Sequence, residues 1–241
     1  MRHDPDNLLG TVLVTGGASG LGLAVVTAVE KAGGTPVVLD RVTLDRSVLP
    51  AGLADVGAEV VDLADGRAAE AAVERIAGRH PRITGVVTAA GTDACGRLDE
   101  VPAERWERVV AVNLLGTAAV IRAALPHLER SGGRVVTVAS TLGLRALSDA
   151  TAYCASKFAV VGFTRALAAE TAGRVGVTLL IPGGMRTHFF DDRPDNYKPG
   201  PDVTLNRPED VAETVLFALR QPPGCELREL VVAHSSETSW P

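Results

Sequence analysis

The sequence contains few aromatic residues and few cysteines, and each shortage restricts what the protein can be. Aromatic residues make up 4% of the 241 residues, so the core must be built mainly from Val, Leu, Ile and Ala. The three cysteines, Cys95, Cys154 and Cys225, are odd in number and lack a CxxC spacing. We therefore expect neither a disulfide scaffold nor a bound metal, and the pattern fits a reducing compartment.

The sequence also lacks a basic cluster and an obvious targeting segment. Its formal charge is −5, with Arg and Glu interspersed, so we expect no nucleic acid partner. Residues 1–9 carry acidic side chains and no apolar core of a signal peptide, and we expect a flexible N-terminus there. The most apolar stretch, Val109–Leu128, contains Asn113 and Arg122 and is interpreted as a buried or interface helix. These features predict a cytoplasmic protein without a membrane span.

Short β-branched runs alternate along the chain with amphipathic segments of helical length. The runs are continuously apolar, which predicts parallel strands covered on both faces. The fold class is therefore α/β: a doubly wound, Rossmann-type parallel sheet of about seven strands with helices on both faces, in a single domain over residues 1–241. The expected strands are 11–15, 36–40, 58–62, 83–89, 134–139, 175–181 and 229–233, and the expected helices are 20–32, 67–77, 151–172 and one that begins near Pro208.

A glycine-rich turn follows the first predicted strand. In Thr15-Gly16-Gly17-Ala18-Ser19-Gly20-Leu21-Gly22, the first glycine suits a tight turn and Gly20 permits close approach of a pyrophosphate. Gly22 would let the next helix pack close to the sheet, and the start of that helix favours negative charge. The run lacks the Gly-Lys-Ser/Thr of a P-loop, so it predicts a dinucleotide site rather than triphosphate chemistry.

Asp40 ends the second strand, where a carboxylate can accept hydrogen bonds from both ribose hydroxyls of an adenosine. It would also repel a 2′-phosphate, which favours NAD over NADP. The neighbouring Arg41 could bind such a phosphate or lie over the adenine. A turn-forming role for Asp40 at the strand end is the alternative.

Tyr153 and Lys157 are one helical turn apart near the start of a predicted helix, so both side chains project from one face. An ammonium next to a phenol favours the phenolate and makes the tyrosine a possible acid/base group. Lysine is rare in this chain compared with arginine, and its compact charge suits this task. Ser140 follows the fifth strand, where it is either a turn residue or a donor to the substrate oxygen.

These motifs resemble those of the short-chain dehydrogenase/reductase family, in its compact branch, from Thr11 to about Val232. Thr15–Gly22 matches the family's TGxxxGxG loop, and Pro182–Thr187 matches its PGxxxT segment. Ser140, Tyr153 and Lys157 match its catalytic set, and Asn113 matches the helix residue that completes its tetrad. One departure follows the fourth strand, where Thr88-Ala89-Ala90-Gly91 replaces the usual Asn-Asn-Ala-Gly and puts the local geometry in question.

The resemblance implies a hydride transfer between a nicotinamide cofactor and a secondary alcohol or ketone. Tyr153 would exchange the proton, Ser140 would hold the substrate oxygen, and Lys157 would lower the Tyr153 pKa and bind the nicotinamide ribose. Asn113 would keep a water in the proton relay. The residues implied to hold the cofactor are Gly16, Ser19, Gly20, Leu21, Gly22, Asp40, Arg41, Asp62, Leu63, Ala90, Gly91, Tyr153, Lys157, Pro182, Gly183 and Thr187.

Residues 187–207 form a long polar segment that includes three of the nine aromatic residues, Phe189, Phe190 and Tyr197. We expect either a substrate lid or rings that anchor a long loop. Four apolar side chains could line a pocket for a small or medium substrate: Leu142, Leu144, Leu147 and Met185. The apolar helices would pair between subunits by the same resemblance, giving a homodimer or homotetramer.

Three other functions compete with this interpretation. A NAD-using epimerase or dehydratase would share the cofactor site, but such relatives carry a larger C-terminal substrate domain. A non-catalytic nucleotide-binding redox sensor would be expected to lose Ser140, Tyr153 or Lys157, and the chain retains all three. A methyltransferase with a similar sheet would leave the Tyr153–Lys157 pair unexplained.

Overall fold

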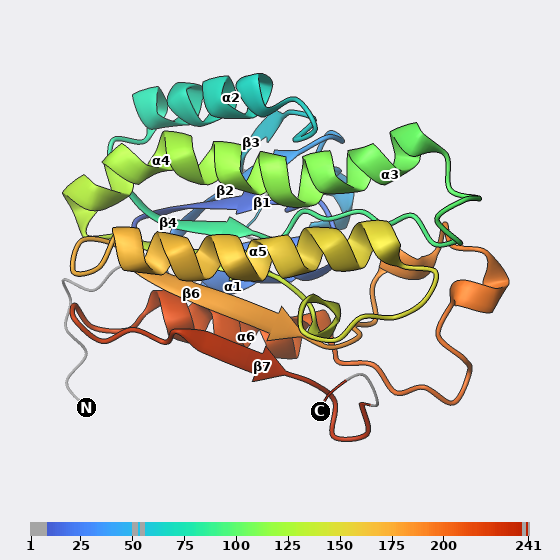
Figure 1. The fold of residues 1–241 in the computed structure, drawn as a ribbon. Helices are drawn as coiled ribbons and strands as arrows, with labels where there is room; N and C mark the ends of the chain where they lie inside the picture. Colours follow the sequence, from blue (N-terminus) through green and yellow to red (C-terminus); the bar gives the residue numbers. More distant parts are fainter. Residues whose placement is uncertain (1–8, 50–52, 54–55, 238–239, 241) are drawn as a thin grey trace.

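Seven parallel strands form one sheet in the order β3-β2-β1-β4-β5-β6-β7 (Figure 1). The computed structural model describes residues 9–49, 53, 56–237 and 240, so most of the expected flexible segment 1–9 lies outside the described residues. The strands are β1 Thr11–Thr15, β2 Thr35–Asp40, β3 Gly57–Val60, β4 Ile83–Thr88, β5 Arg134–Val138, β6 Gly176–Pro182 and β7 Glu229–Val232. The predicted strands are thus confirmed, with ends that differ by one or two residues.

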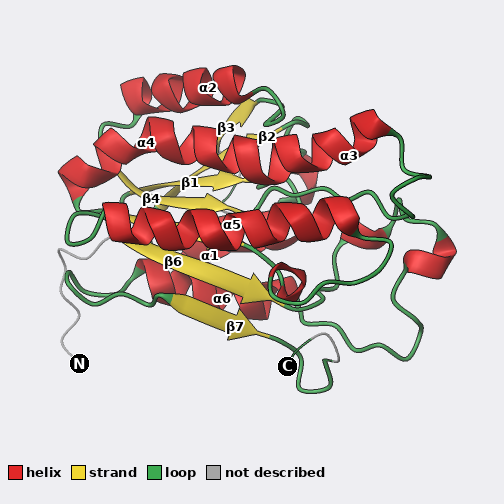
Figure 2. Cartoon of the chain, viewed as in Figure 1, coloured by secondary structure: helices red, strands yellow, loops and turns green. Residues whose placement is uncertain are grey.

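Helices cover both faces of the sheet (Figures 1 and 2). Alternate residues of β1 point to opposite faces: Val12 and Val14 pack with α1 and α6, whereas Leu13 packs with α2 and α4. The helices are α1 Gly20–Lys31, α2 Gly66–Arg79, α3 Ala103–Val110, α4 Thr117–Ser131, α5 Thr151–Glu170 and α6 Pro208–Leu219, with short 3₁₀ turns at Arg46–Val48, Thr141–Gly143, His188–Phe190 and Asp195–Tyr197.

The two edge strands differ from the expectation that every strand is covered on both faces. Side chains of β3 alternate between half-buried and exposed, and so do those of β7. Val60 is 58% exposed and Val231 is 41% exposed, because each lies on a sheet edge that the helices do not cover completely. The expectation was therefore wrong for β3 and β7.

The apolar stretch around Val109–Leu128 belongs to a longer helix that spans Ala103–Ser131. Its length and composition would also suit a membrane span, but half of its most apolar window is buried, and it packs beside α2 and α5. Within it, Ala111–Gly116 forms a π-helical turn that the periodicity did not predict. Such a turn is frequent at functional sites because it redirects side chains between two regular helical segments.

The crevice of the fold is set by the strand order. From β1 the chain crosses to β2 on one side, and later to β4 on the other, so the loops that follow β1 and β4 diverge. Ligands of doubly wound sheets bind at this point, beyond the carboxyl ends of the strands. The loop after β1 and the long segment after β6 both leave the sheet on this side, at the carboxyl ends of the strands (Figure 1).

The π-helical turn depends on a glycine for its contact with the loop after β3. A Cβ atom on Gly116 would lie 2.6 Å from the carbonyl oxygen of Leu63, whereas one on Gly78 in α2 would meet nothing within 4 Å. We expect Gly116→Ala to lower the free energy of unfolding by about 1–3 kcal/mol through overpacking. Gly78→Ala, the matched control, should raise it by up to about 1 kcal/mol because alanine favours helix. Urea unfolding of both variants tests this, and a neutral Gly116→Ala would contradict it.

Candidate active site

A cavity of about 1310 Å³ opens beyond the carboxyl ends of the strands. Loops that follow β1 to β6 border it, so residues far apart in the sequence meet there. Of the catalytic and cofactor-binding residues proposed from the sequence, all but Gly22 and Asn113 line the cavity: Gly16, Ser19, Gly20, Leu21, Asp40, Arg41, Asp62, Leu63, Ala90, Gly91, Ser140, Tyr153, Lys157, Pro182, Gly183 and Thr187.

The loop after β1 is shaped by glycines that no other residue could replace without strain. Gly16 and Gly20 have positive φ angles of 69° and 52°. A Cβ on Gly22 would lie 2.0 Å from the carbonyl oxygen of Gly16, so a larger residue there would displace the loop, although Gly22 itself does not line the cavity. Ser19 precedes α1 without a side-chain capping bond, so its hydroxyl and the first helical N–H groups fit a pyrophosphate.

Asp40 forms hydrogen bonds with two neighbouring loops and also lines the cavity. Its carboxylate accepts hydrogen bonds from the backbone N–H of Ala18 at 3.0 Å and of Val42 at 3.2 Å. A carboxylate has about four acceptor positions, so two remain for a ligand in the cavity. The turn-forming role and the ligand-binding role of Asp40 are therefore compatible.

Asp62 and Leu63 follow β3 at the same end of the cavity. The Asp62 carboxylate accepts from the backbone N–H of Ala64 at 3.0 Å and from Arg108 at 2.8 Å. The hydrogen bond from Ala64 lowers the pKa of Asp62, and Arg108 adds to the effect. Leu63 is 5% exposed and contributes an apolar side chain next to this charged pair.

Tyr153, Lys157 and Ser140 converge where β5 ends and α5 begins. The Lys157 ammonium lies 5.6 Å from the centre of the Tyr153 ring and donates a hydrogen bond to the carbonyl oxygen of Val138 at 2.8 Å. Ser140 and Tyr153 share a side-chain hydrogen bond, and the Ser140 hydroxyl also accepts from the N–H of Leu142 at 3.1 Å. Ser140 is thus both a cap of the following turn and a partner of the phenol.

Burial shifts both titratable groups toward their neutral forms. It raises the pKa of Tyr153 to about 12, and the hydrogen bond with Ser140 opposes the shift. It lowers the pKa of Lys157 to about 8, partly offset by the negative charge of Asp93. At neutral pH the pair is therefore a phenol beside an ammonium, and added positive charge in the cavity would favour the phenolate.

Asn113 lies behind the cavity, in the π-helical turn, and is 1% exposed. Its amide accepts from the N–H of Thr92 at 2.8 Å and donates to the Thr92 carbonyl at 2.9 Å and to Ser156 at 3.0 Å. These bonds fix the loop after β4 beside Gly91, whose missing side chain would point toward Asn113 and Lys157.

The departure at Thr88-Ala89-Ala90-Gly91 leaves a well-formed loop. The Ala90 N–H donates to the Thr15 hydroxyl at 3.1 Å, which ties this loop to β1. The buried Thr88 hydroxyl has no hydrogen-bond partner among the described residues. One polar group is thus left unsatisfied where the family pattern has an amide, while the cavity wall itself remains intact.

Segment 187–207 borders the cavity beside Tyr153. Phe189 packs on Tyr153 with ring centres 5.7 Å apart, and Phe190 also lines the cavity. Of the apolar residues expected in a pocket, Leu142, Leu147 and Met185 line the cavity. Leu144 does not: it packs on a small core cluster with Ala139 and Val160. Tyr197 is likewise outside the cavity lining.

Sequence reasoning missed several polar residues in the cavity. Asp93 and Cys95 come from the loop after β4, Arg193 from segment 187–207, and Glu237 from the chain beyond β7. The Glu237 carboxylate accepts from the N–H of Gly184 at 2.9 Å. Only tertiary structure brings these residues together, although the position of Asp93 just after Gly91 could have marked it.

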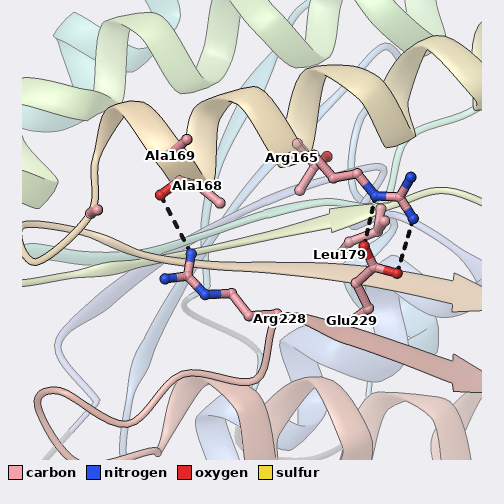
Figure 3. A pocket seen from close by; sticks show the side chains of 8 residues that line it. Arg165, Ala168, Ala169, Leu179, Arg228 and Glu229 are labelled. Carbon is pink, nitrogen blue, oxygen red and sulfur yellow. Dashed lines mark hydrogen bonds and ion pairs between the residues drawn. The ribbon is translucent and has the colours of Figure 1, made fainter.

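A second cavity of about 350 Å³ lies between α5 and the β6–β7 edge (Figure 3). Arg165 pairs there with Glu229, and Arg228 donates to the carbonyl oxygen of Ala168 at 3.4 Å. Alanines form much of its remaining wall, and it is remote from Tyr153. Across the described residues, no group of three or more His, Cys, Asp or Glu could hold a metal ion.

Comparison with known proteins agrees with this geometry. Residues 10–198 match the family model described as short chain dehydrogenase. The chain is 34% identical over 228 residues to 2-(S)-hydroxypropyl-CoM dehydrogenase 3 of Xanthobacter autotrophicus, covering 86% of this chain and 88% of that one. It is 37% identical over 176 residues to D-threitol dehydrogenase of Mycolicibacterium smegmatis, covering 70% and 68%.

Among solved structures, 3-ketoacyl-(acyl-carrier-protein) reductase of Brucella melitensis, complexed with NADH, superposes with a TM-score of 0.82 at 25% identity. The match covers 94% of this chain and 97% of that one. Since the family model spans more than half of the sequence, and the relatives span most of it, the assignment rests on the whole domain. The chain belongs to the short-chain dehydrogenase family and is a nicotinamide-dependent oxidoreductase.

Proposed function

We propose that the protein interconverts a secondary alcohol and a ketone, with Tyr153 as the group that exchanges a proton with the substrate oxygen. The observation that carries the proposal is the convergence of Ser140, Tyr153 and Lys157 at the wall of the large cavity. A phenol that shares a hydrogen bond with a serine, beside a buried ammonium, is suited to acid/base work on a hydroxyl or carbonyl.

The glycine loop and Ser19 would hold the pyrophosphate of the cofactor, and Asp40 and Arg41 would hold its adenosine ribose. Asp62 and Leu63 would flank the adenine. Ala90, Gly91, Pro182, Gly183 and Thr187 would contact the nicotinamide half. When bound, the nicotinamide ring supplies or accepts the hydride. The positive φ angles of Gly16 and Gly20 and the uncapped start of α1 support this assignment.

In this proposal, side chains of the protein carry out the proton transfer. In the oxidative direction the Tyr153 oxygen accepts the alcohol proton, and in the reductive direction the Tyr153 hydroxyl donates a proton to the carbonyl oxygen. Lys157 favours the phenolate by its charge, and its remaining ammonium protons can donate to a ribose. Ser140 donates to the substrate oxygen and keeps it near the phenol. Asn113 supports this arrangement by fixing the loop beside Gly91.

We further propose that segment 187–207 covers a small or medium substrate. The apolar side chains of Leu142, Leu147 and Met185 and the rings of Phe189 and Phe190 line that part of the cavity. The names of the two curated relatives, a hydroxypropyl-CoM dehydrogenase and a threitol dehydrogenase, also denote hydroxylated substrates.

We propose self-association through the face of α4 and α5, as a homodimer or homotetramer in the cytoplasm. Leu115, just before α4, is 56% exposed, and Phe158 on α5 is 45% exposed. The two helices lie side by side on one face of the molecule (Figure 1). Exposed large apolar side chains on adjacent elements are typical of an interface between subunits.

Replacing the phenol tests the chemistry directly. We expect Tyr153→Phe to lower turnover by roughly 100-fold or more, because acid/base groups contribute about 10²–10⁴-fold. The dissociation constant for NADH should change little, since most of the proposed cofactor contacts lie elsewhere. NADH absorbance with a panel of secondary alcohols gives the rate, and Tyr197→Phe is the matched control. Full activity in Tyr153→Phe would refute the mechanism.

Asp40 should decide between NAD and NADP. We expect NADH to bind at least about tenfold more tightly than NADPH, because a carboxylate near the ribose repels a 2′-phosphate. Asp40→Asn keeps an acceptor for the Ala18 N–H but removes the charge, so the affinity for NADPH should rise. Fluorescence titration measures both constants, with Asp62→Asn as the control for loss of a nearby charge. Equal affinities in the wild-type protein would overturn the NAD preference.

The buried ammonium should make stability depend on pH. The pKa of Lys157 is lowered to about 8 in the folded protein, so the unfolded chain binds more protons above that pH. The free energy of unfolding of the wild type, relative to Lys157→Met, should therefore rise from about pH 8 to pH 10, by at most about 1.4 kcal/mol per pH unit. Urea unfolding measures this, and exposed Lys31→Met controls for removing one charge. A flat difference would contradict the burial of a charged Lys157.

A further inference from the structure

An ion pair connects the loop after β4 with segment 187–207. The Arg193 guanidinium lies 2.5 Å from the Asp93 carboxylate, although the two residues are 100 positions apart in the chain. Their side chains are only 18% and 7% exposed, whereas those of the nearby pair Arg97–Asp99 are 65% and 69% exposed. Because water screens it less, the Asp93–Arg193 pair can hold two segments together where an exposed pair contributes little.

The same guanidinium lies against two aromatic rings. Its central carbon is 5.1 Å from the centre of the Phe189 ring and 4.6 Å from that of Phe190. Phe189 in turn packs on the ring of Tyr153, at 5.7 Å. The contacts therefore form a continuous series from Asp93 through Arg193 and Phe189 to Tyr153.

The base of segment 187–207 is fixed independently of this pair. The N–H of Arg186 donates to the carbonyl oxygen of Asn206, and the N–H of Asn206 donates to that of Gly184. The far end has no such backbone pairing to the sheet among the described residues; Arg193 ties it to the loop after β4, and the Tyr197 side chain shares a hydrogen bond with Asp149. Loss of the ion pair should therefore free the Arg193 side chain, and with it the Phe189 ring that it contacts, to shift without breaking the backbone pairing at the base.

Further hydrogen bonds orient the Asp93 carboxylate toward Arg193. It accepts from the N–H of Ala94 at 2.7 Å and from the thiol of Cys95 at 3.3 Å, besides Arg193.

Arg193 also donates to the carbonyl oxygen of Tyr197 at 3.3 Å. Its Nε atom is buried and has no hydrogen-bond partner among the described residues. A guanidinium so enclosed depends on Asp93 to compensate its charge.

We propose that Asp93 and Arg193 are positioning residues that hold Phe189 against Tyr153, where the ring keeps water from the phenol and forms the wall that faces the carbon skeleton of the substrate. The inference rests on the proposed function of Tyr153. It adds a determinant of substrate specificity to that site: with the wall in place, the cavity accepts a substrate whose carbon skeleton fits beside the Phe189 ring while its oxygen reaches the Tyr153 hydroxyl.

The pKa of Tyr153 distinguishes a displacement of the Phe189 ring from the mere loss of a nearby charge. Burial is the main cause of its raised pKa, and the charge of Asp93 raises it further while that of Arg193 lowers it. Removal of Arg193 alone should therefore raise the pKa if the ring stays in place. If the ring moves away, water reaches the phenol and the pKa falls instead.

The experiment uses Tyr197→Phe as background, because Tyr153 is then the one tyrosine left of two, and every variant is compared within this background, which lacks the hydrogen bond between Tyr197 and Asp149. The ultraviolet absorbance of the phenolate is followed against pH in Asp93→Asn, Arg193→Gln and the double variant, after circular dichroism has verified folding. We expect the phenolate to form about one pH unit lower in all three, with no added effect in the double variant. Arg97→Gln, in the exposed neighbouring pair, should leave the titration unchanged.

Two variants that keep both charges make the test independent of how well the charge variants fold. Phe189→Ala should lower the apparent pKa of Tyr153 in the same way, whereas Phe190→Ala, which removes a ring that also contacts Arg193, should have little effect. The dissociation constant for NADH should stay within about twofold in every variant, while KM for 1-phenylethanol should rise about tenfold with a smaller change in kcat.

A higher phenol pKa in Arg193→Gln, or an unchanged one in Phe189→Ala, would overturn the proposal. So would additive shifts in the double variant. If the titrations behave as expected but Tyr153→Phe retains turnover, the wall exists and the proposed chemistry fails, so the two conclusions are tested separately.

Discussion

The site depends on a parallel sheet whose central strands are covered by apolar helices on both faces. Polar groups can then gather only where the chain leaves the sheet, beyond the carboxyl ends of the strands. The glycine loop follows β1 directly, Asp40 ends β2, Ser140 follows β5, and Pro182 ends β6. Burial of the sheet thus brings together residues that are more than a hundred positions apart, and the divergence of the chain at β1 and β4 leaves the space between them open.

Two opposing effects act on the charge of Lys157, which lies beyond the carboxyl ends of the strands. Burial disfavours its charge, yet in the proposed mechanism that charge would favour ionisation of the neighbouring phenol. One hydrogen bond, to the carbonyl oxygen of Val138, compensates part of the lost hydration. An ammonium has three donors, so this bond leaves capacity for a polar ligand in the cavity. The negative charge of Asp93 helps to keep Lys157 protonated, so the ion pair between Asp93 and Arg193 also bears on the charge state of Lys157.

The sequence predicted the elements that have a local signal. Apolar β-branched runs located every described strand, and the TGxxxGxG and Tyr-x-x-x-Lys spacings located four residues that line the cavity: Gly16, Gly20, Tyr153 and Lys157. The edge character of β3 and β7 was missed because a short apolar run has the same pattern at an edge as in the interior. The π-helical turn at Ala111–Gly116 was missed because one wider turn hardly changes the periodicity of a long helix. Asp93 and Arg193 could not be paired because their contact exists only in the folded chain.

Several residues combine a structural role with a place in the site, so the alternatives that the sequence left open were not exclusive. Asp40 closes its own turn and faces the cavity, and Ser140 caps a turn while it bonds to the phenol. The Asn113 side chain forms hydrogen bonds with Thr92 and Ser156, and these bonds fix the loop that borders Lys157. Because the bonds that close these loops also orient the side chains, the arrangement forms when the chain folds. A ligand then meets groups that are already in position, and less of its binding energy is lost in ordering them.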